Sequence, residues 1–311
     1  MREIIVNLLF GAGILAVSSA LFQVASFLFI YLRPSKLHRY RHTTAGKPAW
    51  ALVTGSSAGI GKAYAYELAS HGFNVALHGR SAAKLANVRE ELAAAFPNCS
   101  FKTIVADASQ CATDTIVSAL QGLNLTVLIN NAGGGPFPSF GMVSDYTERE
   151  IMDNVNLNAM FPTLLLSRLL PTLVSNAPSL VINMGSMSDN GLPLMSFYNG
   201  SKAFGRILCQ TLAHDMALEG QAVEVMCVQT GGVTGTSKIQ MKPDLFNPDT
   251  RTFARAALAR VGCGRAVVVG YFPHAMQQVM ADMMPGIVKR KVFITVMKKR
   301  REDERKRIKN N

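Results

Sequence analysis

The chain has 311 residues, of which 49% are hydrophobic and 17% charged, and its net charge is +12. This length suffices for one large domain with appendages. Its five cysteines are spread along the chain without a CxxC pair or a Cys/His cluster. We therefore expect free thiols in a reducing compartment, with neither a disulfide framework nor a metal site.

The positive charge lies at the ends of the sequence. Residues 33–47 and 289–291 carry five and three bases without an acid, and residues 298–309 carry eight bases against three acids. These segments together hold more than the whole net charge, so the rest of the chain is close to neutral. This distribution favours a membrane surface over a nucleic acid as the partner, and we expect membrane lipids and no nucleic acid.

An uncharged, mostly apolar run opens the chain and extends from Ile4 to Leu32. About 20 apolar residues cross a bilayer, and the run is too long for a cleaved signal peptide. We predict a transmembrane anchor over residues 1–33, with an interfacial hairpin as the alternative because Gly11 and Gly13 dilute the run. The bases that follow place the remainder in the cytosol. Pro34 ends the helix, and residues 34–48 are expected to form a basic linker.

Residues 49–273 alternate short β-branched runs with longer helical stretches. The expected strands are 51–54, 74–77, 103–106, 125–129, 180–183 and 223–228; the expected helices are 60–71, 82–96, 112–120, 146–174 (with a break) and 198–219. Apolar strands that alternate with helices indicate a parallel sheet covered on both faces. We therefore predict an α/β fold, a doubly wound parallel sheet of Rossmann type in a single domain.

A glycine-rich turn joins the first expected strand to the first expected helix. Glycines allow a tight turn and close approach of a pyrophosphate, and the helix N-terminus offers free N–H groups. Arg80, at the end of the second expected strand, suits the 2′-phosphate of NADP, and Lys62 could help to bind this phosphate. The alternative is that Arg80 is an ordinary surface arginine. We therefore predict NADPH as cofactor, bound by Gly55, Ser56, Ser57, Gly59, Ile60, Gly61 and Arg80.

Tyr198 and Lys202 stand four residues apart in an expected helix, so their side chains share one face. A free tyrosine has a pKa near ~10, and a nearby ammonium lowers it. The pair could then exchange a proton with a substrate oxygen. An isolated Tyr-x-x-x-Lys is more often an ordinary surface pair, so the interpretation depends on the other motifs.

Three motifs together resemble the short-chain dehydrogenase/reductase superfamily: Thr54-Gly55-Ser-Ser-Ala-Gly59-Ile-Gly61, Asn130-Asn-Ala-Gly133 and Tyr198-x-x-x-Lys202. The resemblance covers residues 49 to about 236. The anchor, the stretch from Lys47 to Gly55 and the basic C-terminus are similar to the membrane-bound very-long-chain 3-oxoacyl-CoA reductase and 17-beta-hydroxysteroid dehydrogenase group.

The resemblance implies roles for further residues. Asn131, Ala132 and Gly133 would stabilise the sheet and line the adenosine pocket, and Asp107 would contact adenine. Lys202 would also hold the nicotinamide ribose, next to Tyr198.

The resemblance also implies a catalytic set of Asn156, Ser186, Tyr198 and Lys202. Asn156 would hold a water in a proton relay, and Asn154 and Asn158 are its neighbours. Ser186 would bind the substrate oxygen.

The chain departs from the family pattern in the spacing of the catalytic serine and tyrosine. The usual separation is thirteen residues, but Ser186 precedes Tyr198 by twelve. The thirteenth residue back is Gly185, which has no hydroxyl. We therefore expect Ser186 to act across a loop shortened by one residue, with Ser188 as the fallback.

A second departure lies after the sixth expected strand, where Thr230-Gly231 replaces the family's Pro-Gly. The loss of the proline predicts a more flexible loop on the nicotinamide side. Gly231 and Val233 remain expected cofactor contacts through their backbone.

Residues 274–311 are predicted to form a Met-rich amphipathic and basic extension. Apolar residues recur at helical spacing on one expected face, and either core packing or an adaptable apolar lid at a lipid surface would explain them: Met276, Val279, Met280, Met283, Met284, Ile287 and Val288. The last five residues weakly resemble a basic retrieval signal for the endoplasmic reticulum.

The function predicted from these features is NADPH-dependent reduction of a lipophilic ketone, most simply a long-chain 3-oxoacyl-CoA. The expected location is the endoplasmic reticulum membrane with the catalytic domain facing the cytosol. A 17-ketosteroid or another lipophilic ketone is the alternative substrate, and a catalytically silent nucleotide-binding membrane scaffold is the alternative of another class. A second copy of the chain is a further candidate partner.

Overall fold

The computed structural model describes residues 2–236 and 242–309. At its centre is a parallel sheet of seven strands in the order β3-β2-β1-β4-β5-β6-β7. The strands are β1 Ala49–Thr54, β2 Asn74–Gly79, β3 Phe101–Val105, β4 Asn124–Asn130, β5 Ser179–Ser186, β6 Val223–Thr230 and β7 Val267–Val269. Their carboxyl ends meet at one edge, where an open α/β sheet places its ligand site.

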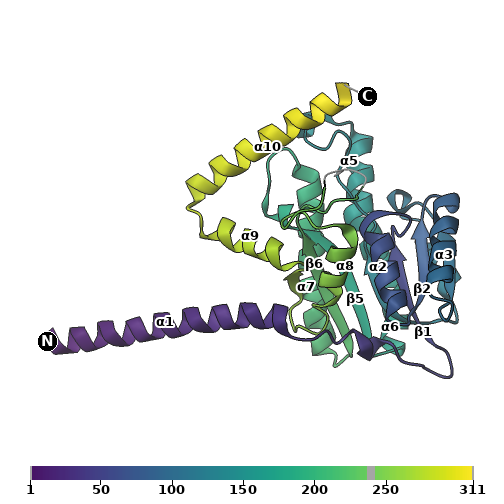
Figure 1. Ribbon diagram of the computed structural model, residues 1–311, viewed down its shortest axis with the longest axis horizontal. Helices are drawn as coiled ribbons and strands as arrows, with labels where there is room; N and C mark the ends of the chain where they lie inside the picture. The colour runs from purple at the N-terminus through teal and green to yellow at the C-terminus, as the bar shows by residue number, and fades with distance from the viewer. Residues whose placement is uncertain (1, 237–241, 310–311) are drawn as a thin grey trace.

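Helices cover both faces of the sheet, as predicted (Figure 1). On one face, α2 (Gly59–Ser70), α3 (Ala82–Ala95) and α8 (Thr250–Leu258) bury their apolar residues against the strands. On the other face pack α4 (Thr113–Leu120), α6 (Phe161–Ser175) and α7 (Ser196–Leu218). The prediction of a doubly wound sheet is therefore confirmed. Neither β7 nor α8 was predicted; β7 has only three residues, which are too few to show a clear period.

The break predicted within residues 146–174 is a π-helical turn. Helix α5 (Glu148–Val155) begins at a capping box, in which Thr147 and Glu150 exchange hydrogen bonds. The π-helical turn Asn156–Met160 then joins α5 to α6 without a loop. A π-helical turn widens the helix and re-aims the side chains within it, and such turns are frequent at functional sites.

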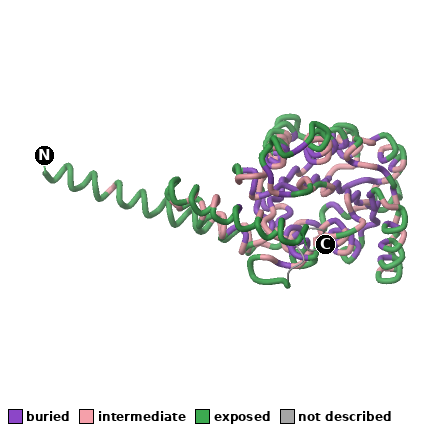
Figure 2. Tube along the Cα trace, turned by 90° about the horizontal axis from the view of Figure 1, so that it is seen from above, coloured by how far each residue is buried: buried purple, intermediate pink, exposed green. Residues whose placement is uncertain are grey.

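Helix α1 (Arg2–Leu32) projects away from the domain, with its N-terminus at the far end (Figures 1 and 2). Most of its side chains are exposed, and Leu15 and Phe22 are both 73% exposed. Among the described helices, α1 and the continuous α5–α6 helix are long and apolar enough to cross a membrane, but the latter is packed in the core. A helix of this length and composition, exposed over nearly all its surface, is a candidate membrane anchor.

The segment expected to be a linker packs against the domain instead of forming a free tether. Leu37 and Tyr40 lie in the short 3-10 helix η1 (Leu37–Tyr40), and each is only 2% exposed. The Tyr40 hydroxyl donates to Glu224 on β6, and Thr126 on β4 donates to the Tyr40 carbonyl at 2.7 Å. Apolar burial explains the difference, since counting bases alone does not reveal that two large side chains of this segment belong to the core.

The C-terminal extension forms two helices, α9 (Phe272–Met283) and α10 (Gly286–Lys309). Met284 and Pro285 separate them, so the predicted single apolar face is interrupted by a bend. Most of its apolar residues are exposed, which excludes core packing as their explanation in this structure. From the bend, α10 crosses back towards α5 (Figure 1).

Candidate active site

The glycine-rich turn between β1 and α2 has the geometry of a phosphate cradle. Gly55 and Gly59 have positive φ angles of 67° and 60°, which favour glycine. A Cβ on Gly61 would lie 2.3 Å from the Gly55 carbonyl oxygen, so only glycine fits there. Ala58 precedes α2 without a side-chain cap, which leaves the first amides of the helix available. The turn therefore fits the pyrophosphate of a dinucleotide.

Asn131 braces the end of β4 against this turn. Its side chain donates to the Thr54 carbonyl at 2.9 Å, and the amides of Asn131 and Ala132 both donate to the Thr54 hydroxyl at 2.9 Å. A Cβ on Gly55 would meet the Ala132 backbone at 2.9 Å. The sequence prediction that the Asn-Ala-Gly segment stabilises the sheet is consistent with these contacts.

The remaining residues expected to bind the cofactor lie around the turn. Ser56 is buried and donates its amide to the His78 carbonyl at 2.9 Å. Ser57 lies next to Gly79 at the end of β2, where Arg80 follows and is exposed. Asp107 uses a carboxylate oxygen to accept from the Ser109 amide at 2.9 Å, which fixes the turn after β3.

Lys62, the expected assistant of Arg80, is engaged elsewhere. Its ammonium lies 2.6 Å from the Glu91 carboxylate. Ile60 stands at the start of α2 and is partly buried.

Ser186 and Tyr198 meet at the carboxyl edge of the sheet despite their shortened separation. Ser186 ends β5, and its hydroxyl lies 2.9 Å from that of Ser188. Burial raises the pKa of the Tyr198 phenol above its ordinary value, while a hydrogen bond with Ser186 lowers it and the Asp189 charge raises it. A raised pKa keeps the phenol protonated at neutral pH, as a proton donor requires.

Gly185, thirteen residues before Tyr198, faces the opposite side of the strand. A Cβ there would lie 2.7 Å from the Cys227 sulfur on β6. Since side chains alternate along a strand, Ser186 is the residue that points towards Tyr198.

The shortened loop is held by a buried carboxylate. Asp189 lies in the 3-10 helix η5 (Met187–Asn190), which ends at Gly191 with a φ of 90°. One Asp189 oxygen accepts from Arg206 on α7 and from Gln229 on β6, each at 2.9 Å. These three residues connect the loop to both neighbouring elements and were not identified from the sequence, because nothing local marks their pairing.

Lys202 is 7% exposed and lies under the turn that follows β4. Its ammonium donates to the Met184 carbonyl at 2.8 Å and lies 5.9 Å from the centre of the Tyr198 ring. Burial lowers the pKa of Lys202 to about 8. We expected Lys202 to lower the Tyr198 pKa. In this structure the largest effect on that phenol is burial, which acts in the opposite direction.

Three asparagines lie on the α5 helix and its π-helical turn. Asn158 exchanges two hydrogen bonds with Gly134: its oxygen accepts from the amide at 3.0 Å and its nitrogen donates to the carbonyl at 2.9 Å. Asn154 donates to the same carbonyl at 2.8 Å. A Cβ on Gly133 would lie 2.8 Å from the Asn158 oxygen and 3.1 Å from the Lys202 nitrogen. The structure thus brings Asn158 beside Lys202, whereas Asn156 starts the π-helical turn and is only partly buried.

The loop after β6 is fastened by His274, which the sequence analysis missed. The Gly231 amide donates to His274 Nδ1 at 3.2 Å, and His274 Nε2 lies 3.1 Å and 3.0 Å from the carbonyls of Gly232 and Phe246. His274 is fully buried, and burial lowers its pKa, which favours the neutral ring that these bonds need.

The prediction of a more flexible loop without the proline disagrees with these contacts, because His274 from α9 forms hydrogen bonds with the loop at Gly231, Gly232 and Phe246. The Gly231 amide is also already bonded, and Val233 is buried.

The loop between β4 and α5 lies beside the start of α7, which carries Tyr198. Glu304 on α10 accepts from the Ser139 amide at 2.8 Å and from the Phe140 amide at 3.2 Å. Within the loop, Tyr146 donates to the Pro138 carbonyl, and its ring packs edge-on against Phe197, next to Tyr198. The far end of the chain is therefore linked, through this loop, to the residue that precedes Tyr198.

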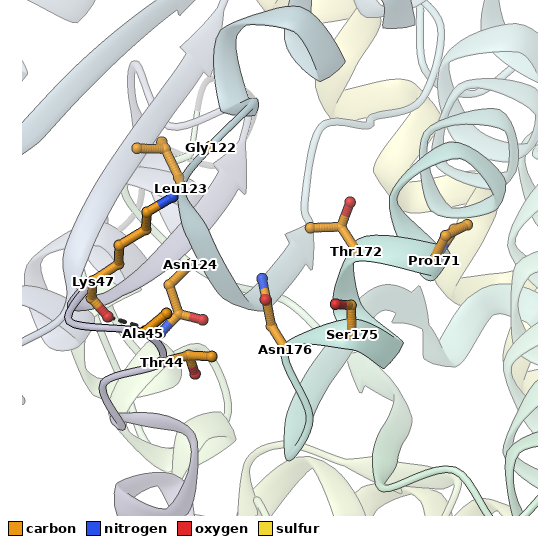
Figure 3. Close-up of a pocket in the computed structure, with 10 residues that line it drawn as sticks. All are labelled: Thr44, Ala45, Lys47, Gly122, Leu123, Asn124, Pro171, Thr172, Ser175 and Asn176. Atoms are coloured by element: carbon orange, nitrogen blue, oxygen red, sulfur yellow. Dashed lines mark hydrogen bonds between the residues drawn. The ribbon is translucent and has the colours of Figure 1, made fainter.

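A hollow of about 430 Å³ lies at the amino ends of the strands, away from the carboxyl ends where this site lies. The turn at Thr44 and Lys47 forms one side, and Thr172, Ser175 and Asn176 from the end of α6 form the other (Figure 3). Asn124 lies on the Thr44 side and donates to the Lys47 carbonyl at 3.2 Å. This arrangement fastens the packed N-terminal segment.

The fold and these motifs define a class of protein. The family model described as "short chain dehydrogenase" matches residues 49–244. The chain belongs to the short-chain dehydrogenase/reductase family and is an oxidoreductase of that type.

The known proteins similar to this chain include a relative in sequence and two solved structures. It is 30% identical over 304 residues to the very-long-chain 3-oxoacyl-CoA reductase of Homo sapiens, covering 97% of this chain and 96% of that protein. A solved 7beta-hydroxysteroid dehydrogenase matches 80% of this chain and 96% of its own at 21% identity, with a TM-score of 0.71. A metagenomic short-chain oxidoreductase in complex with NADP matches 71% of this chain and 96% of its own at 26% identity, with a TM-score of 0.58.

Proposed function

We propose that the protein is an NADPH-dependent reductase of long-chain 3-oxoacyl-CoA thioesters. The observation that carries the proposal is the meeting of Ser186, Tyr198 and Lys202 beside the phosphate cradle. Relatives named very-long-chain 3-oxoacyl-CoA reductase support the substrate class, and the exposed Arg80 and the NADP complex of a similar protein support the cofactor.

The proposed mechanism assigns the proton to this chain and the hydride to the cofactor. Bound NADPH would supply the hydride that reduces the ketone carbon. Tyr198 donates its phenolic proton to the substrate oxygen. Ser186 donates a hydrogen bond to that oxygen as negative charge develops on it. Lys202 holds positive charge nearby and would bind the nicotinamide ribose.

Proton resupply would pass through an asparagine next to Lys202. The geometry favours Asn158 over Asn156, because Asn158 and Lys202 flank the same glycine. We expect Asn158→Ala to reduce kcat by about 10²-fold. The loss should be larger than that of Asn156→Ala, while NADPH affinity stays close to wild type. The reverse ranking would assign the relay to Asn156.

A basic surface near the site mouth favours a CoA thioester over a steroid. The half of α10 that reaches the β4–α5 loop carries eight bases on either side of Glu304: Lys298, Lys299, Arg300, Arg301, Arg305, Lys306, Arg307 and Lys309. These bases would attract the phosphates of CoA.

The direct test follows NADPH oxidation by the full-length protein against 3-oxoacyl-CoAs of increasing chain length and against 17-ketosteroids. The proposal predicts turnover with the long-chain thioesters. Turnover of steroids alone would contradict the acyl-CoA proposal and identify a ketosteroid as the substrate. NADPH binding without turnover of any ketone would indicate a catalytically silent scaffold.

The proposed location is the endoplasmic reticulum membrane, with α1 as anchor and the domain in the cytosol. Asn98 provides a test of orientation, since it begins an Asn-Cys-Ser sequon and is exposed. We expect protein from its native host to keep its electrophoretic mobility after glycosidase treatment. A shift would place the domain in the lumen.

A further inference from the structure

The bend between α9 and α10 exposes an apolar surface. We call residues 276–292 the elbow. Met283 at the end of α9 is 80% exposed, and Ile287 in the first turn of α10 is 76% exposed. Met280 and Val288 are 58% and 46% exposed on the same bend. Methionine adapts to irregular apolar surroundings, so this surface suits a fluid partner.

The elbow lies on the side of the domain from which α1 projects. Both views show α1 and the elbow extending in the same direction (Figures 1 and 2). The start of α9 is fixed to the end of α1, because the Phe272 ring packs 5.1 Å from Tyr31 and 6.0 Å from Phe27. The exposed apolar surface of α1 therefore continues onto α9 and the elbow.

The charges of the elbow match an anionic surface. Its acid, Asp282, is paired with Lys289 at 2.7 Å across the bend, so neither charge stands alone next to the apolar tip. Arg290 and Lys291 follow and are both exposed. An apolar tip with a basic flank is the composition of segments that lie in the headgroup boundary of a membrane.

We propose that the elbow is a second membrane contact, which inserts Met283 and Ile287 into the headgroup–acyl boundary of a bilayer containing anionic phospholipid. The inference rests on the proposed membrane attachment by α1. It adds a contact near the C-terminus, more than 240 residues away in sequence. The same helix reaches the β4–α5 loop through Glu304. The elbow thus places α10 between the lipid surface and the site, along the route of an acyl chain leaving the bilayer.

Tryptophan quenching tests the elbow without reference to activity. The chain has one tryptophan, Trp50 in β1, so added tryptophans can be compared over a constant background. Full-length Val288→Trp is reconstituted in vesicles of phosphatidylcholine and phosphatidylglycerol with brominated acyl chains. Val105→Trp is the matched control, because Val105 is 47% exposed on β3, the strand at the far edge of the sheet from β7. Leu15→Trp reports the insertion of α1.

The proposal predicts that brominated lipid quenches the added emission of Val288→Trp at least about twofold more strongly than that of Val105→Trp. Equal quenching of the two, with Leu15→Trp quenched, would overturn the elbow contact and leave the anchor standing. An unquenched Leu15→Trp would overturn both. A blue-shifted but unquenched Val288→Trp would mean that protein, such as a second copy, covers the elbow, which also contradicts the proposal.

The basic flank supplies a second measurement. Replacing Lys289, Arg290 and Lys291 together by glutamine should reduce the Val288→Trp quenching in vesicles that contain phosphatidylglycerol. In vesicles of phosphatidylcholine alone the same replacement should change little. An equal effect in both vesicles would contradict the electrostatic part of the proposal.

Discussion

The two sides of the site are held together in different ways. On the cofactor side, the contacts join neighbouring strands near their carboxyl ends, as when Asn131 braces Thr54 and Gly55. On the substrate side, Glu304 from the end of the chain holds Ser139 and Phe140. The cofactor side therefore depends mostly on contacts at the edge of the sheet, whereas the substrate side depends on where α10 lies. One consequence is that the cofactor side should respond to small backbone changes and the substrate side to changes far away in sequence.

Loss of the phenol at the junction of the two sides should have the largest effect. We expect Tyr198→Phe to reduce kcat by about 10³-fold, because the proton donor is removed. NADPH affinity, measured by fluorescence titration, should stay close to wild type. Tyr66→Phe is the control, since it removes a hydroxyl that bonds Glu91 at the surface. Activity of Tyr198→Phe near that of the control would assign the proton to another group.

A single methyl group should disable the cofactor side. In Gly61→Ala the new Cβ would lie 2.3 Å from the Gly55 carbonyl oxygen. Because this oxygen belongs to the backbone, relieving the clash requires a backbone shift that costs free energy. We expect an about 10²-fold loss of NADPH affinity and an about 1–3 kcal/mol loss of stability. Gly200→Ala adds the same methyl where nothing lies within 4 Å, and its NADPH affinity should be unchanged. Similar behaviour of the two variants would show that the turn is not tightly constrained.

His274 connects the two sides, because it reaches from α9 to the loop after β6. His274→Phe removes its bonds to that loop, and we expect an about 10-fold loss of NADPH affinity. His214→Phe, at an exposed position on α7, is the matched control. Equal affinities in titration would mean that the loop holds its position without the ring.

The buried Lys202 should cost stability when it is charged. Its pKa is lowered to about 8 in the folded protein, so the unfolded chain binds more protons between pH 8 and about 10.5. Stability then rises with pH across this window. We expect Lys202→Met, without cofactor, to gain about 1–2 kcal/mol at pH 7 and to lose most of that gain by pH 10. Denaturant unfolding at both pH values measures this, and a gain independent of pH would point to packing instead.

The smallest effect is expected on the substrate side. Glu304→Ala frees the β4–α5 loop, and we expect KM for the acyl-CoA to rise about threefold to tenfold with little change in NADPH affinity. Glu302→Ala on the same helix removes an equal charge from an exposed position. If both variants raise KM equally, general electrostatics explains the effect. If Glu304→Ala alters NADPH affinity instead, the position of the β4–α5 loop also affects cofactor binding, which contradicts the separation into two sides.

The features that could be predicted from the sequence are those determined by residues close together in the chain. The strand–helix alternation and the glycine turn follow from short periods and backbone requirements, and the structure contains them as expected. The partners of His274 and Asp189 could not be predicted, because their contacts lie 17 to 43 residues away in sequence. The π-helical turn rotates Asn158 towards Lys202, and counting residues along an ideal helix does not reveal that rotation.

The packing of Leu37 and Tyr40 has a consequence for how the domain would meet the proposed acyl-CoA substrate. The residues after α1 are packed into the domain and Arg260 donates to the Ile30 carbonyl, so the end of α1 is joined to the domain by several contacts. If α1 spans a bilayer as proposed, this packing would restrict rotation of the domain about it. The site would then face the bilayer at a nearly constant angle, and the proposed acyl substrates would reach it in the same orientation.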